Sequence, residues 1–184
     1  MALDTQLFYF LNNLAGQSQF FDGIVIFLAS YLAYILIAIF FLFLLFIEHS
    51  WREKIQIFVI TVVSALIARF GITELIRFFY HRPRPFIDHT VNQLLTNDNW
   101  SFPSGHATFF FAVATAVYLY IKKWGIFFFI GTILITVSRV IAGIHYPSDI
   151  IGGAFIGIAV AYAVFYLVRK IVATQNKETP TPNH

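Results

Sequence analysis

Long apolar runs separated by short polar segments are the feature that most limits what this chain can fold into. Of its 184 residues, 59% are hydrophobic and only 11% are charged, and the mean hydropathy is +0.75. A water-soluble domain needs more polar surface than this composition supplies. A bilayer is crossed by helices, because a helix hydrogen-bonds all its backbone groups internally. The sequence therefore predicts an all-α, polytopic membrane protein.

The apolar runs predict six transmembrane helices, over residues 19–31, 33–48, 54–79, 106–121, 124–143 and 150–168. The first two runs are short against the roughly 20 residues that a span requires, so a single span over 24–47 is the alternative. We favour two spans, with a turn between Tyr31 and Tyr34, because Phe20 and Phe21 extend the first run. An even number of spans also suits the charge distribution.

The two ends of the chain differ from the middle. Residues 2–15 place apolar side chains at helical spacing, with Asp4, Asn12 and Asn13 on the opposite face. That pattern predicts an N-terminal helix lying in the membrane interface. We expect residues 1–170 to form one membrane-embedded domain and residues 171–184 to be a polar tail, disordered from about Arg169 onward.

Lysine and arginine residues indicate the orientation. Six spans place both termini on one side, together with seven basic residues: Arg52, Lys54, Lys122, Lys123, Arg169, Lys170 and Lys177. The opposite side has four: Arg77, Arg82, Arg84 and Arg139. Because cytoplasmic loops are enriched in basic residues, we expect both termini in the cytoplasm and the loop of residues 80–104 outside.

Three polar clusters come together at that outer face. They are the end of the third span with Arg77 and Arg84, the start of the fourth with Ser104, Gly105 and His106, and the link before the sixth with Arg139, His145 and Asp149. Charged groups at the end of an apolar run are costly unless they are paired or used. The predicted topology therefore gives one pocket with three arginines, two histidines and one aspartate.

The chemistry of this pocket suits a phosphate monoester or diphosphate. Arginine forks neutralise and orient the anion. His145 and Asp149 are four residues apart, so on a helical turn the carboxylate can hold one imidazole nitrogen while the other attacks phosphorus. Ser104 as N-cap and Gly105 would leave the first N–H groups of the fourth span free to hold an anion. Taken singly, the clusters are equally compatible with a capped helix start and a structural His–Asp pair.

Taken together, they resemble a known tripartite signature. Arg77 with Arg84-Pro85, then Pro103-Ser104-Gly105-His106, then Ser138-Arg139 with His145 and Asp149 are similar in order and spacing to the type 2 phosphatidic acid phosphatase superfamily. The resemblance implies that His145 forms a phosphohistidine, Asp149 orients it and His106 protonates the leaving group. It also implies that Arg77, Arg84, Arg139, Ser104 and Gly105 bind the phosphate.

The resemblance implies neither a metal nor another cofactor. A metal site would need clustered carboxylates, and only Asp149 enters the pocket. The family usually has lysine at the position of Arg77, so a planar fork here replaces a point charge. We expect Glu74 to form an ion pair with Arg77, Arg69 to pair within the bundle, and Arg82 to lie in the outer loop without a role in the site.

The substrate is expected to be a lipid phosphate in the outer leaflet, with no nucleic-acid partner. The chain looks most like bacterial undecaprenyl-diphosphate phosphatases. Phosphatidylglycerophosphate, phosphatidate and diacylglycerol diphosphate are the alternative substrates. A different class, an anion transporter or lipid scramblase with arginines along its path, would need charge through the whole bilayer, whereas most polar residues here lie at one face.

Overall fold

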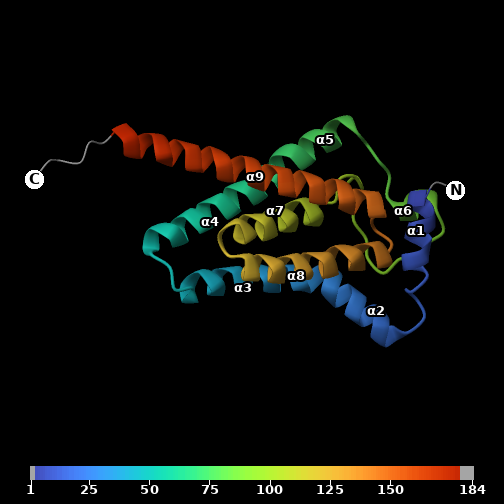
Figure 1. Ribbon diagram of the computed structural model, residues 1–184. Helices are drawn as coiled ribbons and strands as arrows, with labels where there is room; N and C mark the ends of the chain where they lie inside the picture. Colours follow the sequence, from blue (N-terminus) through green and yellow to red (C-terminus); the bar gives the residue numbers. More distant parts are fainter. Residues whose placement is uncertain (1–2, 179–184) are drawn as a thin grey trace, which may run out of the picture.

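The computed structural model describes residues 3–178, and within that range the chain is helical with no β-strand (Figure 1). The elements are α1 (Leu3–Asn12), α2 (Gln19–Ile26), η1 (Phe27–Tyr31), α3 (Leu32–Phe46), α4 (Trp51–Leu66), η2 (Ile67–Ile72), α5 (Thr73–Phe79), α6 (Pro85–Asp88), α7 (Gly105–Tyr120), α8 (Lys122–Ile141) and α9 (Pro147–Glu178). The two η elements are π-helical turns inside longer helices.

The first membrane helix is a single one, so the prediction of two spans here was wrong. The elements α2, η1 and α3 form one 28-residue helix over Gln19–Phe46. The expected turn between Tyr31 and Tyr34 lies inside it, and no proline or glycine follows Gly23 to break it. Directly before the expected turn the helix contains the π-turn Phe27–Tyr31, which widens a helix without ending it.

Within residues 3–178, four helices are long and apolar enough to cross a membrane: Gln19–Phe46, Trp51–Phe79, Lys122–Ile141 and Pro147–Thr174. The apolar helix α7 has 16 residues and lies among them. The structure therefore does not reproduce the predicted six spans. Large apolar side chains such as Phe46, Phe78 and Phe155 are at least 70% exposed, as expected for helices that contact lipid. The protein is a multi-pass membrane protein.

The two ends of the described chain lie at opposite ends of the bundle (Figure 1). This arrangement does not match the prediction of both termini on one side, which depended on the two short spans that are one helix. The predicted disorder from Arg169 onward is wrong as far as Glu178, since α9 continues to that residue. Residues 179–184 lie outside the described residues.

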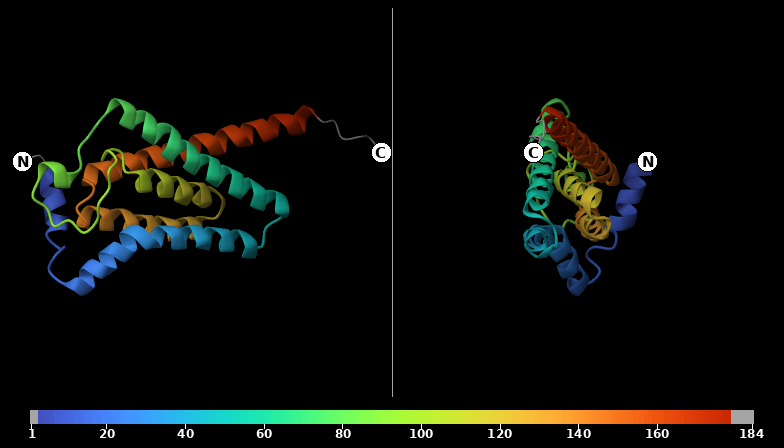
Figure 2. Two further views of the ribbon diagram at one scale, coloured as in Figure 1. Left: turned by 180° about the vertical axis from the view of Figure 1, so that it is seen from behind. Right: turned by 60° about the vertical axis from the view of Figure 1, so that its left-hand side comes forward.

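Helix α7 is the centre of the bundle and contacts α4, η2, α8 and α9 (Figure 2). Helix α9 approaches it very closely because Gly153 and Gly157 face it. A Cβ atom at Gly157 would lie 2.5 Å from the carbonyl oxygen of Thr108. Small residues allow two membrane helices to pack backbone against backbone. This packing brings the first turn of α9 to the first turn of α7.

Helix α1 lies across the same end of the bundle and contacts α8 and α9. The Asn12 side chain fixes it by donating to the carbonyl oxygens of Ile141 and Asn92, both at 2.8 Å. Asp4, Phe8 and Asn12 are turned toward the protein, while Leu3 and Phe10 are exposed. The predicted N-terminal helix is present, and its location in the membrane interface stays a prediction.

Candidate active site

The predicted histidine–aspartate pair lies where α8 gives way to α9. Gly143, with φ of 81°, adopts the left-handed conformation in the turn that follows α8. His145 Nδ1 then lies 3.3 Å from Asp149 Oδ2, and His145 Nε2 lies 3.3 Å from Arg84 Nη1. A carboxylate only accepts, so the ring proton is assigned to Nδ1 and the lone pair to Nε2. Burial lowers the pKa of His145 to about 3, so the imidazole is neutral at physiological pH.

The carboxylate of Asp149 is fully buried and is held by four donors. Besides His145, they are the backbone N–H of Tyr146 at 2.8 Å, the hydroxyl of Ser101, and Arg82 Nη1 at 2.7 Å. A buried charge requires such a complete set of partners. Ser101 and Arg82 belong to the loop of residues 80–104, so the loop is part of the site.

Arg82 links this carboxylate to the N-terminal helix. Its Nη2 donates to Asp4 Oδ2 at 2.7 Å, and its Nη1 donates to Ser148 Oγ at 2.6 Å. The guanidinium carbon lies 4.1 Å from the centre of the Tyr146 ring. Although burial lowers the pKa of Arg82, the carboxylates of Asp149 and Asp4 raise it by more, so the arginine stays charged. This contact was not predictable from sequence patterns, because Arg82 and Asp4 are 78 residues apart.

Arg84 holds the loop against the link that carries the histidine. Its Nε donates to the carbonyl oxygen of Asn99 and its Nη1 to that of Ile144, each at 2.6 Å. Burial lowers the pKa of Arg84 to about 10, which still leaves it protonated at neutral pH. A fixed positive charge therefore lies directly beside His145 Nε2.

Arg77 and Arg139 reach the site from α5 and α8. Arg77 Nη2 donates to the carbonyl oxygen of Pro103 at 2.9 Å, and Arg139 Nη1 donates to that of Ala29 in η1 at 3.0 Å. Both side chains are buried. Glu74 Oε1 accepts from Arg77 Nη1 at 3.3 Å and from Arg69 Nη1, so the two predicted ion pairs are one shared contact.

Ser104 stands at the N-cap position of α7, but its hydroxyl does not cap the helix. Its backbone N–H donates to the Asp149 carbonyl oxygen at 3.1 Å, which ties α7 to α9. Within residues 3–178, four buried side-chain polar atoms lack a hydrogen-bond partner: Thr61 Oγ1, Arg77 Nε, Ser104 Oγ and Arg139 Nε. Three of the four belong to predicted phosphate-binding residues. Buried donors without partners are rare and call for an explanation such as a ligand.

His106 lies in the first turn of α7, beside the unsubstituted Cα of Gly105, and lines a groove that Arg69 and Tyr34 also line. The groove adjoins an apolar cavity between α3, α4 and α7. Both are lined by Ile37, Phe109 and Phe110. An apolar path therefore leads away from the polar end of the bundle.

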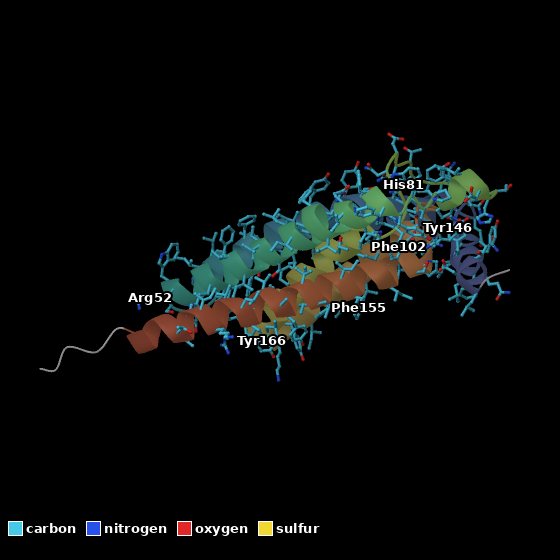
Figure 3. The ribbon with its side chains drawn as sticks, turned by 90° about the horizontal axis from the view of Figure 1, so that it is seen from above. Arg52, His81, Phe102, Tyr146, Phe155 and Tyr166 are labelled. Atoms are coloured by element: carbon cyan, nitrogen blue, oxygen red, sulfur yellow. The ribbon has the colours of Figure 1, made fainter. Side chains whose placement is uncertain are left out.

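The structure brings all eight predicted site residues to that end. Tyr146 and Phe102, which flank two of the predicted motifs, lie there with His81, whereas Arg52 lies at the other end (Figure 3). In the part of the chain that the structure describes, no three His, Asp or Glu side chains are placed to hold a metal ion. The site is instead rich in arginine and hydroxyl donors, a set that suits an anion.

Comparisons with known proteins identify the family of the chain. The family model described as the PAP2 superfamily matches residues 56–173. The chain is 30% identical to undecaprenyl-diphosphatase BcrC of Bacillus subtilis, over 89% of this chain and 83% of the relative. It is 25% identical to a lipid A 4'-phosphatase of Bacteroides thetaiotaomicron, over 98% of this chain and 83% of the relative.

The fold also has a close counterpart among solved structures. The crystal structure of Aquifex aeolicus LpxE superposes with a TM-score of 0.73 at 28% identity, covering 90% of this chain and 96% of that one. The signature that the sequence resembles, the family match and the shared fold all agree. The chain is therefore a membrane-bound phosphatase that belongs to the PAP2 superfamily.

Proposed function

We propose that this protein hydrolyses a lipid diphosphate, undecaprenyl diphosphate to undecaprenyl phosphate, through a phosphohistidine intermediate. The observation that carries the proposal is the set of buried, unpartnered donors on Arg77, Ser104 and Arg139. They lie in the three motifs that surround the His145–Asp149 pair, and a bound phosphoryl group would give each of them an acceptor. The relative from Bacillus subtilis named undecaprenyl-diphosphatase supports the choice of lipid.

In the proposed first step, the lone pair on His145 Nε2 attacks phosphorus. The Nδ1 proton stays shared with Asp149, whose negative charge stabilises the positive charge that develops on the ring. Arg84 Nη1 now faces that lone pair at 3.3 Å, so the contact gives way as phosphorus approaches. The guanidinium, held by the carbonyl oxygens of Asn99 and Ile144, would then stabilise the negative charge of the phosphoryl group in the transition state.

The bond from phosphorus to the leaving oxygen breaks, and its electron pair stays on that oxygen. His106, at the groove, is the proposed acid that protonates the oxygen when it leaves as an alkoxide. A water molecule then attacks the phosphohistidine, releasing inorganic phosphate and restoring the neutral histidine. The water supplies the oxygen of the released phosphate; one of its protons stays on that phosphate, and the other restores the proton that His106 gave to an alkoxide leaving group.

The groove beside His106 supports a lipid as the substrate. Its continuation between α3, α4 and α7 is lined almost entirely by apolar side chains, including Leu36, Phe40 and Val113. An apolar chain placed there would gain contacts that inorganic phosphate or a small ester does not make. This groove therefore favours a long-chain lipid over a soluble phosphate ester.

The basic residues support an extracytoplasmic site. Arg52 lies at the end of the bundle opposite the site, as Figure 3 shows. Lys122 and Lys123 begin α8, whose last turn carries the site residue Arg139, so they also lie away from the site. Since cytoplasmic loops carry the excess of lysine and arginine, we propose that this opposite end faces the cytoplasm. Helix α1 would then lie on the outer side together with the site.

A substrate panel tests the proposal. Phosphate release from purified protein in detergent would be measured with undecaprenyl diphosphate, diacylglycerol diphosphate, phosphatidylglycerophosphate, phosphatidate and lipid A. His145→Ala gives the background. We expect the highest kcat/KM with undecaprenyl diphosphate. A higher value with lipid A or phosphatidylglycerophosphate would reassign the substrate, and lipid movement between leaflets without any phosphate release would favour a scramblase.

A further inference from the structure

Arg69 is a positive charge on the path between the phosphate site and the apolar groove. Arg69 lies in the π-turn η2, eight residues before Arg77. At 1.5 Å per residue, its backbone is about 12 Å farther from the site along the helix axis than that of Arg77. Its side chain lines the groove beside His106, among mostly apolar side chains. π-turns inside longer helices often occur at functional sites. The ion pair with Glu74 gives Arg69 a partner, but it does not explain why the arginine lines the groove.

The Arg69 side chain lies directly against the first residue of α7. A Cβ atom at Gly105 would lie 2.6 Å from Arg69 Nε, so any larger residue would displace the arginine. The positive charge of its guanidinium therefore lies beside the N-terminus of α7. The helix dipole and the free N–H groups there also favour an anion. The unpartnered hydroxyl of Ser104 is adjacent in the sequence, and it is fully buried.

The contact with Glu74 shows that Arg69 and Arg77 can reach the same oxygen atom. Glu74 Oε1 accepts from Arg77 Nη1 at 3.3 Å and also from Arg69 Nη1. The Glu74 side chain is 48% exposed, so its two contacts are easily exchanged with solvent or a ligand. One anion can thus be held between an arginine of the phosphate motif and the arginine of the groove.

We propose that Arg69 binds the inner, lipid-attached phosphate of a diphosphate substrate and so makes the enzyme prefer diphosphates to monoesters. The inference rests on the proposed phosphatase function. Arg77, Arg84 and Arg139 hold the outer phosphoryl group that is transferred. A monoester has no second anionic group to place beside Arg69, whereas a diphosphate does.

The proposed contact also acts on the leaving group. When His145 Nε2 bonds to the outer phosphorus, the bond to the bridging oxygen breaks and its electron pair remains on the inner phosphate. The negative charge of that group increases during the step, so Arg69 stabilises the transition state more than the ground state. The leaving lipid phosphate then needs less help from a proton on His106.

The test compares two substrates with the same isoprenoid tail, farnesyl diphosphate and farnesyl monophosphate. For Arg69→Gln we expect kcat/KM for the diphosphate to fall about 10- to 100-fold, the worth of one charge-assisted hydrogen bond. For the monophosphate we expect a change below about threefold, since it lacks the group that Arg69 holds. Arg69→Lys keeps the charge but not the fork, so it should fall between wild type and Arg69→Gln.

Two further variants separate binding from structure. Arg52→Gln makes the same change of charge at the far end of the bundle and should change neither rate. Glu74→Gln breaks the same ion pair but leaves Arg69 free for the substrate, so the preference for the diphosphate should persist. If Arg69 is only structural, Arg69→Gln and Glu74→Gln will lower both rates in parallel, and the inference is wrong.

The wild type tests the proposed function by itself. If it releases no phosphate from any lipid phosphate, the proposed function fails, and the inference that rests on it fails too. If it hydrolyses both farnesyl substrates and Arg69→Gln leaves their ratio unchanged, the function stands and only the role of Arg69 is refuted.

Discussion

Replacing Arg82 tests whether the loop supports the catalytic pair from behind. Arg82→Gln removes the charged donor from Asp149 Oδ1, now 2.7 Å away, while Oδ2 keeps the Tyr146 N–H, Ser101 and His145. The histidine therefore keeps its direct partner, but the buried carboxylate loses its counter-charge. We expect slower turnover of a correctly folded enzyme.

The contacts set the size of this effect. A hydrogen bond to a charged group contributes about 1.5 to 3 kcal/mol, which corresponds to a fall in kcat of about 10- to 100-fold if it is lost fully in the transition state. Asp4→Asn leaves the Arg82–Asp149 contact in place and weakens only a partly exposed ion pair, worth up to about 1 kcal/mol. Its kcat should fall by no more than about fivefold.

The measurement is phosphate release at saturating substrate in detergent, with a thermal unfolding curve for each variant. The double variant of Arg82→Gln and Asp4→Asn should be no slower than Arg82→Gln alone, because Asp4 acts through Arg82. Arg52→Gln, at the opposite end, controls for the loss of one positive charge. A kcat for Arg82→Gln within about twofold of wild type would refute the role of Arg82 in holding Asp149.

Three other predictions address the mechanism, the metal and the orientation. His145→Ala should lose all activity and trap no phosphoenzyme on denaturation during turnover, whereas His106→Ala should lose about 10²- to 10⁴-fold on phosphatidate and less on a diphosphate; a phosphoenzyme in His145→Ala would reverse the two roles. Activity should survive EDTA and be inhibited by vanadate, because arginines and N–H groups surround the phosphate; inhibition by EDTA that magnesium reverses would contradict this. In intact cells a cysteine at Asn97 should react with a membrane-impermeant thiol reagent and one at Lys123 should not; the reverse pattern would place the site in the cytoplasm.

The site was predictable from the sequence where it depends on local spacing. His145 and Asp149 are one helical turn apart, so their contact follows from the helix itself. Arg77, Ser104 and Arg139 lie at ends of apolar runs, and the alternation of such runs across a membrane brings these ends together.

The support of the site was not predictable, because it depends on contacts without a periodic pattern. Arg82 and Asp149 are 67 residues apart, and a polar loop gives no indication of which of its charges turns inward. Arg69 lies inside the π-turn η2. A π-turn has more residues per turn than an α-helix, so its side chains point in other directions than a regular helix would predict. Apolar periodicity alone does not locate such a turn.

The error at Tyr31–Tyr34 had a limited effect for a topological reason. Merging two short spans into one helix moves only what precedes that helix to the other side of the membrane. The basic residues used for orientation all follow it, so the argument for an extracytoplasmic site is unchanged. What changes is α1, which moves from the predicted cytoplasmic side to the side of the site. Asp4 can reach Arg82 and Ser148 only from the side of the site, so the ion pair at 2.7 Å is consistent with the single helix.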